Sequence, residues 1–218
     1  DILGKYTNQP IWKILGGKFG KSVSLYRAIS QEDPETMSKK VKGYKQEGYN
    51  KFQLKVGGDP DEDIERIKLV RSMLDKSDVL IADANTGWLM HDALRIIKAT
   101  EHLDIYYEQP CISYEESLAV RRKTKNPFIL DENIHSIHSF LRAFNDKAMD
   151  IINIKISKLG GITNSRLMRD LCVHLGIAMT IEDSWGGDIA TSAISHLAHS
   201  TPEKLRFSST DFNSYNSF

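Results

Sequence analysis

The chain alternates short β-like runs with helical stretches, and a charged residue closes five successive runs at nearly constant spacing. Three carboxylates form the middle of this series, and a lysine stands on either side of them: Lys55, Asp83, Glu108, Asp131 and Lys155. The successive intervals are 28, 25, 23 and 24 residues, about the length of one strand, one helix and two short loops. The spacing predicts one βα unit per step, with a charged group at the end of each strand.

The alternation continues along almost the whole chain. We expect eight strands, near residues 22–30, 51–57, 78–84, 105–110, 128–133, 150–157, 177–183 and 205–210. Seven helical stretches lie between them, and the first, at 34–48, opens with Pro34 and ends at Gly48, as helices commonly do. Strands that alternate with helices in this way predict an α/β fold with a parallel sheet.

A closed TIM-like barrel is favoured over an open doubly wound sheet. No glycine-rich phosphate fingerprint follows the first expected strand, and polar residues recur at the C-terminal ends of nearly every strand, as in barrel enzymes. A length of 218 residues is compatible with one barrel, a fold that typically takes about 250 residues. We therefore expect residues 1–20 to form a lead-in segment and residues 21–218 to form the barrel domain.

Strand periodicity indicates where the charged residues point. Side chains alternate between the two faces of a strand, so Gln53 shares a face with Lys55, and Asn85 shares a face with Asp83. If the parallel strands close into a barrel, the five charged residues point into one mouth. Three acids flanked by two amines are the components of a metal site with a proton-transfer group on each side.

Composition argues against several classes of partner. The formal net charge is zero and the sequence pI is about 7.2, with no basic patch, so nucleic acid is not an expected partner. No apolar run approaches the length needed to span a membrane. Cys111 and Cys172 lack metal-type spacing, which favours a reduced, cytoplasmic protein. The expected partner is a small-molecule substrate, and self-association into a homo-oligomer is left open.

Five motifs in order make the chain resemble the enolase superfamily, within its muconate-lactonizing-enzyme subgroup. The motifs are Lys55 in a K-x-K-like position, Asp83-x-Asn85, Glu108-Gln109-Pro110, Asp131-Glu132, and Asn153-x-Lys155 followed by Gly160-Gly161. The resemblance implies a (β/α)7β barrel in which the three acids Asp83, Glu108 and Asp131 hold Mg²⁺. It also implies that Lys55 and Lys155 act on opposite faces of the substrate. One departure is Gln53, which stands where the family has the first lysine of K-x-K.

Two segments point to a smaller group within this subgroup. Residues 181–188 and 207–215 look most like those of cis-3-hydroxy-L-proline dehydratases and the related proline-betaine epimerases. That likeness implies that Asp183 pairs with the substrate ammonium, with Trp185, Thr210 and Asp211 near the same rim. Betaine epimerases carry an aromatic residue where Thr210 falls, and this suits a quaternary nitrogen by cation–π attraction. Thr210 therefore favours an unmethylated secondary amine.

The expected reaction follows from the chemistry of these groups. Removing a proton α to a carboxylate builds a second negative charge, which a cation held by carboxylates can neutralise. The resemblance to the dehydratases implies a lyase that dehydrates cis-3-hydroxy-L-proline, with Lys55 and Lys155 as acid and base. A racemase or epimerase of an amino-acid derivative would use the same two lysines. From another class, an inactive fragment or scaffold is an alternative, because superfamily enzymes carry an N-terminal capping domain of about a hundred residues, a usual domain size. We expect that domain to be absent from this chain.

Some of these residues also allow other roles. An acid at a strand end often caps the following helix, and Lys158 competes with Lys155 for the role of reacting amine. Asp183 has a structural alternative, because Glu182 lies next to it on the expected opposite face. Two histidine pairs have i,i+3 spacing that could bind a metal, but we expect both on helices outside the barrel: His135 with His138, and His196 with His199.

Overall fold

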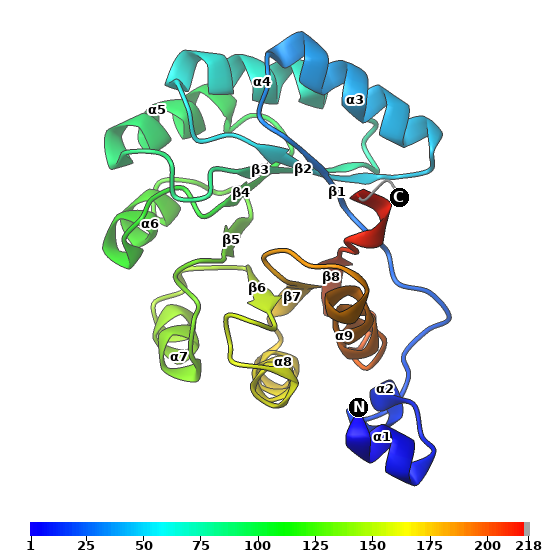
Figure 1. Ribbon diagram of the computed structural model, residues 1–218. Helices are drawn as coiled ribbons and strands as arrows, with labels where there is room; N and C mark the ends of the chain where they lie inside the picture. Colours follow the sequence, from blue (N-terminus) through cyan, green and yellow to red (C-terminus); the bar gives the residue numbers. More distant parts are fainter. Residues whose placement is uncertain (216–218) are drawn as a thin grey trace. The chain divides into compact units, whose positions relative to one another are not determined.

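The computed structural model describes residues 1–215, in which eight strands alternate with seven helices, α3 to α9 (Figure 1). This is the strand–helix succession of a (β/α)7β barrel, as predicted. The chain divides into two compact units. The first unit runs from Tyr26 to Asp150, and the second combines residues 1–25 with the chain from Ile151 onward.

The first unit contains five βα repeats. Its strands pair in parallel in sequence order, β1 to β5. The elements are β1 (Arg27–Ile29), α3 (Pro34–Gln46), β2 (Lys51–Lys55), α4 (Pro60–Ser72), β3 (Val79–Asp83), α5 (Met90–Thr100), β4 (Tyr106–Glu108), α6 (Tyr114–Arg121), β5 (Phe128–Leu130) and α7 (Ile137–Asn145).

The second unit contains the last three strands, of which β6 pairs in parallel with β7, and β7 with β8. Its elements are α1 (Ile2–Thr7), α2 (Ile11–Ile14), β6 (Ile151–Lys155), α8 (Ile162–Leu175), β7 (Ala178–Glu182), α9 (Asp188–His199), β8 (Arg206–Ser209) and the 3₁₀ helix η1 (Asn213–Tyr215). The expected lead-in segment therefore includes two short helices.

The lead-in segment is anchored by hydrogen bonds within the second unit. Arg169 on α8 donates from Nη2 to the Leu15 carbonyl at 2.7 Å, and the Phe19 amide donates to the His199 carbonyl at 2.8 Å. Arg206 on β8 donates from Nη1 to the Phe19 carbonyl at 3.4 Å. Arginines with several donors in a planar fork can hold irregular backbone in this way, so the segment is integral to this unit.

Local sequence signals account for where several helices begin. Asp33 and Asp59 each accept backbone amide hydrogen bonds at the start of α3 and α4, and a proline follows each of them. Ser113 forms a capping box with Glu116 at the start of α6. The first strand is shorter than expected: only Arg27–Ile29 pairs with β2, although Leu25 forms an isolated bridge with Ser209 of β8.

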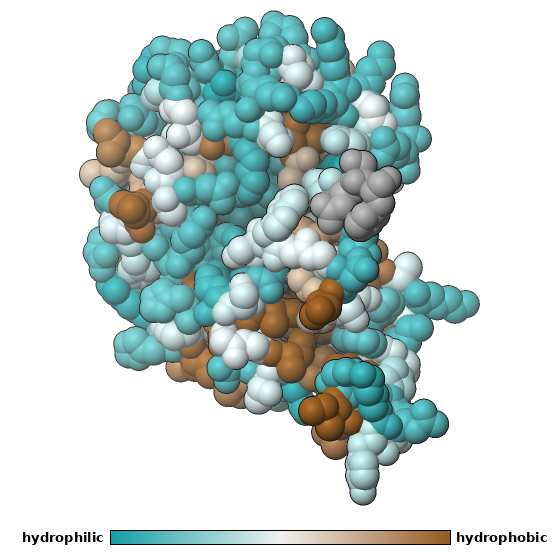
Figure 2. Space-filling view, in the orientation of Figure 1, coloured by the Kyte–Doolittle hydropathy of each residue, from teal (hydrophilic) through white to brown (hydrophobic). Residues whose placement is uncertain are grey.

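The strand interiors form the cores of the two units. Phe52, Leu54, Leu80 and Ile129 in the first unit, and Ile154 in the second, are fully buried. Large apolar side chains of this kind supply most of the driving force for folding. The viewed face is largely hydrophilic, with apolar residues in separate groups (Figure 2).

The described residues bear on two further expectations. None of the helices within residues 1–215 is long and apolar enough to cross a membrane. Cys111 and Cys172 are both free and buried. Burial raises the pKa of the Cys111 thiol to about 11 and that of Cys172 to about 12, so neither is a reactive thiolate at neutral pH.

Candidate active site

Lys55 and Asp83 meet at the ends of two neighbouring strands of the first unit. Each is the last residue of its strand, and their Cα atoms are register partners between β2 and β3. Lys55 Nζ forms an ion pair with Asp83 Oδ2, and the Asn85 amide donates to Asp83 Oδ1 at 2.9 Å. Asp83 is fully buried, whereas the Lys55 side chain is 31% exposed. A buried carboxylate and an accessible amine are therefore held in contact.

Glu108 ends the next strand and is the register partner of Asp83. Its carboxylate is buried and accepts hydrogen bonds from Gln53 Nε2 at 3.2 and 3.1 Å. Gln53 is the residue that departs from the K-x-K pattern. The neutral Gln53 side chain therefore orients the Glu108 carboxylate. Because the resembling family has a lysine at this position, the chain has one positive charge fewer near Lys55.

Asp131 directly follows β5 and is buried. The next residue, Glu132, accepts a hydrogen bond from Asn85 Nδ2 at 3.2 Å. Burial, together with the charges of Asp131 and Asp83, raises the pKa of the Glu132 carboxyl. Asn85 therefore contacts Asp83 at the end of β3 through its backbone amide and Glu132 after β5 through its side chain.

The donor chemistry of Asp83, Glu108 and Asp131 fits Mg²⁺, which prefers carboxylate oxygens. All three carboxylates are buried at the C-terminal ends of successive parallel strands of one unit. Within residues 1–215, however, no three acids, histidines or cysteines are gathered closely enough to hold a metal ion. Asp83 instead pairs with Lys55, and Glu108 accepts hydrogen bonds from Gln53.

Lys155 lies in the second unit, where its partner is a residue that sequence reasoning did not select. Lys155 and Glu182 end β6 and β7, and they are register partners. Lys155 Nζ lies 3.7 Å from Glu182 Oε1, and Glu182 is 2% exposed. Glu182 thus faces Lys155. The alternation along β7 alone had predicted the reverse, with Asp183 on the face of the site and Glu182 on the other face. The missing signal was the register between the two strands, which neither strand encodes by itself.

Asp183 binds the loop that follows Lys155. Its Oδ2 accepts from the Ser157 amide at 3.0 Å, and its Oδ1 accepts from the Ser157 hydroxyl and, at 2.8 Å, from the Ser184 amide. Asp183 is half-buried. Its carboxylate therefore orients this loop and retains a solvent-accessible side.

The other expected substrate contacts of the second unit follow its last two strands: Trp185 comes after β7, and Thr210 and Asp211 come after β8. Trp185 is 65% exposed and packs against Phe212, with ring centroids 5.3 Å apart. Thr210 is buried and donates its hydroxyl to the Asp211 carbonyl at 3.2 Å, and Asp211 Oδ1 accepts from the Ser214 amide at 3.2 Å. The structure therefore offers an exposed indole and a hydroxyl already engaged by backbone.

Sequence reasoning also missed a buried carboxylate behind the strand ends of the first unit. Asp63 Oδ2 accepts hydrogen bonds from the Gly57 and Gly58 amides, each at 2.9 Å, and from Trp88 Nε1 at 2.7 Å. Its Oδ1 accepts from Arg66 at 2.8 Å. Asp63 thereby joins the loops that follow Lys55 and Asp83. No local signal predicts this, because the donors come from two separate loops.

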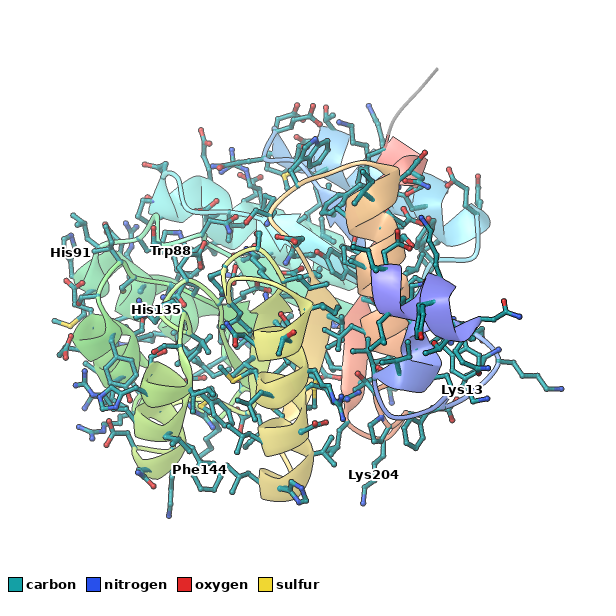
Figure 3. All side chains as sticks on the ribbon, turned by 60° about the horizontal axis from the view of Figure 1, so that its bottom comes forward. Lys13, Trp88, His91, His135, Phe144 and Lys204 are labelled. Atoms are coloured by element: carbon teal, nitrogen blue, oxygen red, sulfur yellow. The ribbon has the colours of Figure 1, made fainter. Side chains whose placement is uncertain are left out.

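The remaining candidates lie apart from these contacts. Lys158 is half-buried in the turn after β6. His135 precedes α7 (Figure 3). His138 lies on α7, and both histidines are exposed. His196 and His199 lie on α9. Within the described residues, neither histidine pair belongs to a group of three or more side chains that could bind a metal ion.

We expect the α9 histidines to make the protein less stable in acid. Burial is the main cause that lowers the pKa of His196 and His199, and Lys18 and Arg206 lower that of His199 further. The unfolded state therefore binds protons first as pH falls, so stability that is present above about pH 6.5 is lost below it. Replacing His199 with Asn should reduce the drop in urea midpoint between about pH 7.5 and about pH 5. His138→Asn is the control, and an unchanged drop in His199→Asn would contradict the prediction.

Comparisons with known proteins show what the chain is similar to. The family described as "Enolase C-terminal domain-like" matches residues 36–217. A protein of Roseibium aggregatum named cis-3-hydroxy-L-proline dehydratase is 60% identical over 215 residues, which cover 99% of this chain and 59% of that relative. More distant relatives include the N-succinyl-L-Arg/Lys racemase of Bacillus cereus, 31% identical over 92% of this chain and 55% of its own length.

Solved structures show the same fold. A mandelate racemase/muconate lactonizing enzyme from Roseovarius nubinhibens matches with a TM-score of 0.96 and 40% identity, covering 100% of this chain and 58% of its own. An enolase superfamily member from the same organism, complexed with magnesium, matches with a TM-score of 0.92 and 33% identity, covering 98% and 58%. These matches confirm the predicted α/β, TIM-like barrel class. The chain spans about three fifths of the length of these relatives.

Proposed function

The chain belongs to the enolase C-terminal domain-like family, and from this membership we propose that the protein dehydrates cis-3-hydroxy-L-proline. The observation that carries the proposal is the 60% identity, across 99% of the chain, to a protein named for that activity. The named racemase is only 31% identical. The buried strand-end acids of the first unit and the two lysines Lys55 and Lys155 are the groups that we propose would carry this reaction.

We propose that Asp83, Glu108 and Asp131 hold Mg²⁺. The bound ion would supply positive charge to the substrate carboxylate while the α-carbon loses its proton. Gln53 donates to both oxygens of Glu108, and the Asn85 amide donates to Asp83. These contacts would keep the carboxylates oriented, as hydrogen bonds to metal-binding side chains commonly do.

Lys55 and Lys155 would carry the proton transfers. One lysine removes the proton from C2, and the ammonium of the other delivers a proton to the 3-hydroxyl, which leaves as water when the C3–O bond breaks. The product is an enamine that tautomerises to a cyclic imine. Each lysine has a buried carboxylate beside it, Asp83 for Lys55 and Glu182 for Lys155, and such a counter-charge stabilises an ammonium.

Residues of the second unit support the proposed substrate class. The Asp183 carboxylate would pair with the ring ammonium of the substrate through its solvent-accessible side. Trp185 and Asp211 would lie near the same ammonium. Thr210 is buried and offers no aromatic face, so a quaternary nitrogen would lose the cation–π attraction that suits it. A secondary amine is therefore the proposed substrate, in preference to an N,N-dimethylated one.

The test is an NMR assay of the full-length protein with Mg²⁺ and cis-3-hydroxy-L-proline. We expect loss of the C3 hydroxyl and formation of a pyrroline carboxylate, with no turnover of N,N-dimethylproline. Inversion at the α-carbon without loss of water would instead support the epimerase alternative, which the more distant racemase relative favours. A folded protein that acts on none of these compounds would support the scaffold alternative.

A further inference from the structure

The side chain of Gln109 joins the ends of two strands that carry proposed metal ligands. It directly follows Glu108 at the end of β4 and is fully buried. Its Oε1 accepts from the Asp131 amide at 3.0 Å and the Asn133 amide at 3.3 Å. Its Nε2 donates to Asn133 Oδ1 at 2.6 Å and the Cys111 carbonyl at 3.0 Å. Both acceptor positions and both hydrogens of the amide are therefore used.

The backbone around Gln109 binds the loop after β3 in the same way. The Ala84 amide donates to the Glu108 carbonyl at 3.2 Å, and the Thr86 amide donates to the Gln109 carbonyl at 2.9 Å. The loops that follow Asp83, Glu108 and Asp131 thus meet at one residue. All of these contacts lie within the first unit.

Backbone strain is concentrated in these same loops. Gln109 has φ 34°, and Asn85 and Thr86 have φ 43° and 69°, a left-handed region that residues other than glycine rarely adopt. Such conformations persist where the surrounding contacts determine them. The hydrogen bonds of the Gln109 amide are contacts of this kind.

We propose that Gln109 is a positioning residue, whose amide fixes the loop after β5 and so places the Asp131 carboxylate relative to Asp83 and Glu108. The role toward Mg²⁺ rests on the proposed function, whereas the role toward the loop does not. Gln109 acts through Asp131, because its amide is fully engaged by protein groups. Hydrogen bonds behind metal ligands commonly govern metal affinity in this way.

A matched comparison exists at the opposite ends of the same two strands. Asn126 precedes β5, and its Nδ2 donates to the Leu103 carbonyl at 2.8 Å and the Ile105 carbonyl at 3.2 Å, ahead of β4. Asn126 therefore links β4 and β5 as Gln109 does, but far along the strands from the carboxylates. Asn126→Leu and Gln109→Met each replace a bridging amide with an apolar side chain of similar size.

The experiment measures Mg²⁺ affinity by titration calorimetry and amide hydrogen exchange without metal, in the full-length protein. For Gln109→Met we expect Mg²⁺ to bind about tenfold to a hundredfold more weakly, and the Asp131 and Asn133 amides to exchange about tenfold faster. Asn126→Leu should change neither quantity by more than about twofold. Gln109→Asn is a second variant, because asparagine tolerates positive φ while its shorter side chain loses the bridge, and it should weaken binding in the same direction.

Three results would overturn the inference. The first is unchanged Mg²⁺ affinity and amide exchange in both Gln109 variants. The second is an equal loss of Mg²⁺ affinity in Asn126→Leu, which would show a general loss of stability. The third concerns the case in which the wild type binds no Mg²⁺, so that the metal assignment of the proposed function fails. In that case, unchanged amide exchange of Asp131 and Asn133 in Gln109→Met overturns the role of Gln109 toward the loop. Faster exchange of these two amides supports that role.

Discussion

Lys55→Ala and Lys155→Ala are each expected to lower the turnover of cis-3-hydroxy-L-proline by the full-length protein by about 10²- to 10⁴-fold. Each substitution removes a group that we propose transfers a proton in the transition state, and general acid–base catalysis contributes an effect of about this size. Rates of water loss and of α-hydrogen exchange in D₂O separate the two roles. The variant that lacks the base should lose both, whereas the variant that lacks the acid should retain exchange.

Lys158→Ala is the matched control for Lys155→Ala. Lys158 lies three residues further on, in the turn after β6. Its replacement should leave turnover within about twofold of the wild type, because Lys158 has no proposed role in proton transfer. If Lys158→Ala stops the reaction while Lys155→Ala does not, Lys158 is the reacting amine. If both Lys55→Ala and Lys155→Ala keep normal turnover, the two-lysine mechanism is wrong.

Asp83→Ala is expected to abolish the stabilisation that Mg²⁺ gives to the folded protein. A ligand that binds only the native state adds about 2.7 kcal/mol at a concentration a hundredfold above its Kd. For a chain of this size that corresponds to a rise in Tm of about 5–10 °C. Asp83 is fully buried beside Lys55, so its replacement removes a proposed Mg²⁺ ligand together with the carboxylate that pairs with Lys55.

The control for Asp83→Ala uses the other end of the same strand. Asp78 immediately precedes β3 and is buried, and it accepts hydrogen bonds from Lys45 Nζ at 2.6 Å and the Asp75 amide at 2.9 Å. Asp78→Ala removes a buried carboxylate just before β3 and leaves the proposed ligands unchanged. Melting curves with and without Mg²⁺ should show the full metal-induced rise in Asp78→Ala. A normal rise in Asp83→Ala would exclude Asp83 as a ligand.

Much of the fold is readable from the sequence because its signals are local. The helix starts at Pro34 and Pro60 follow from an aspartate that caps the first turn and a proline that suits it. The strand ends at Lys55, Asp83 and Glu108 follow from a charged residue that closes an apolar run. Each signal needs only neighbouring residues, so the order of elements and the candidate acids and lysines were predictable without coordinates.

The contacts among those residues were decided by tertiary structure. Glu182 faces Lys155 because of the register between β6 and β7, and counting along β7 alone indicated the wrong face. Asp63 and Gln109 are buried among donors and acceptors from separate loops, which no local pattern reports. The sequence by itself determined which groups stand at the strand ends, because periodicity is local. Only the tertiary structure decided which of them touch, because register and loop packing depend on residues far apart in the chain.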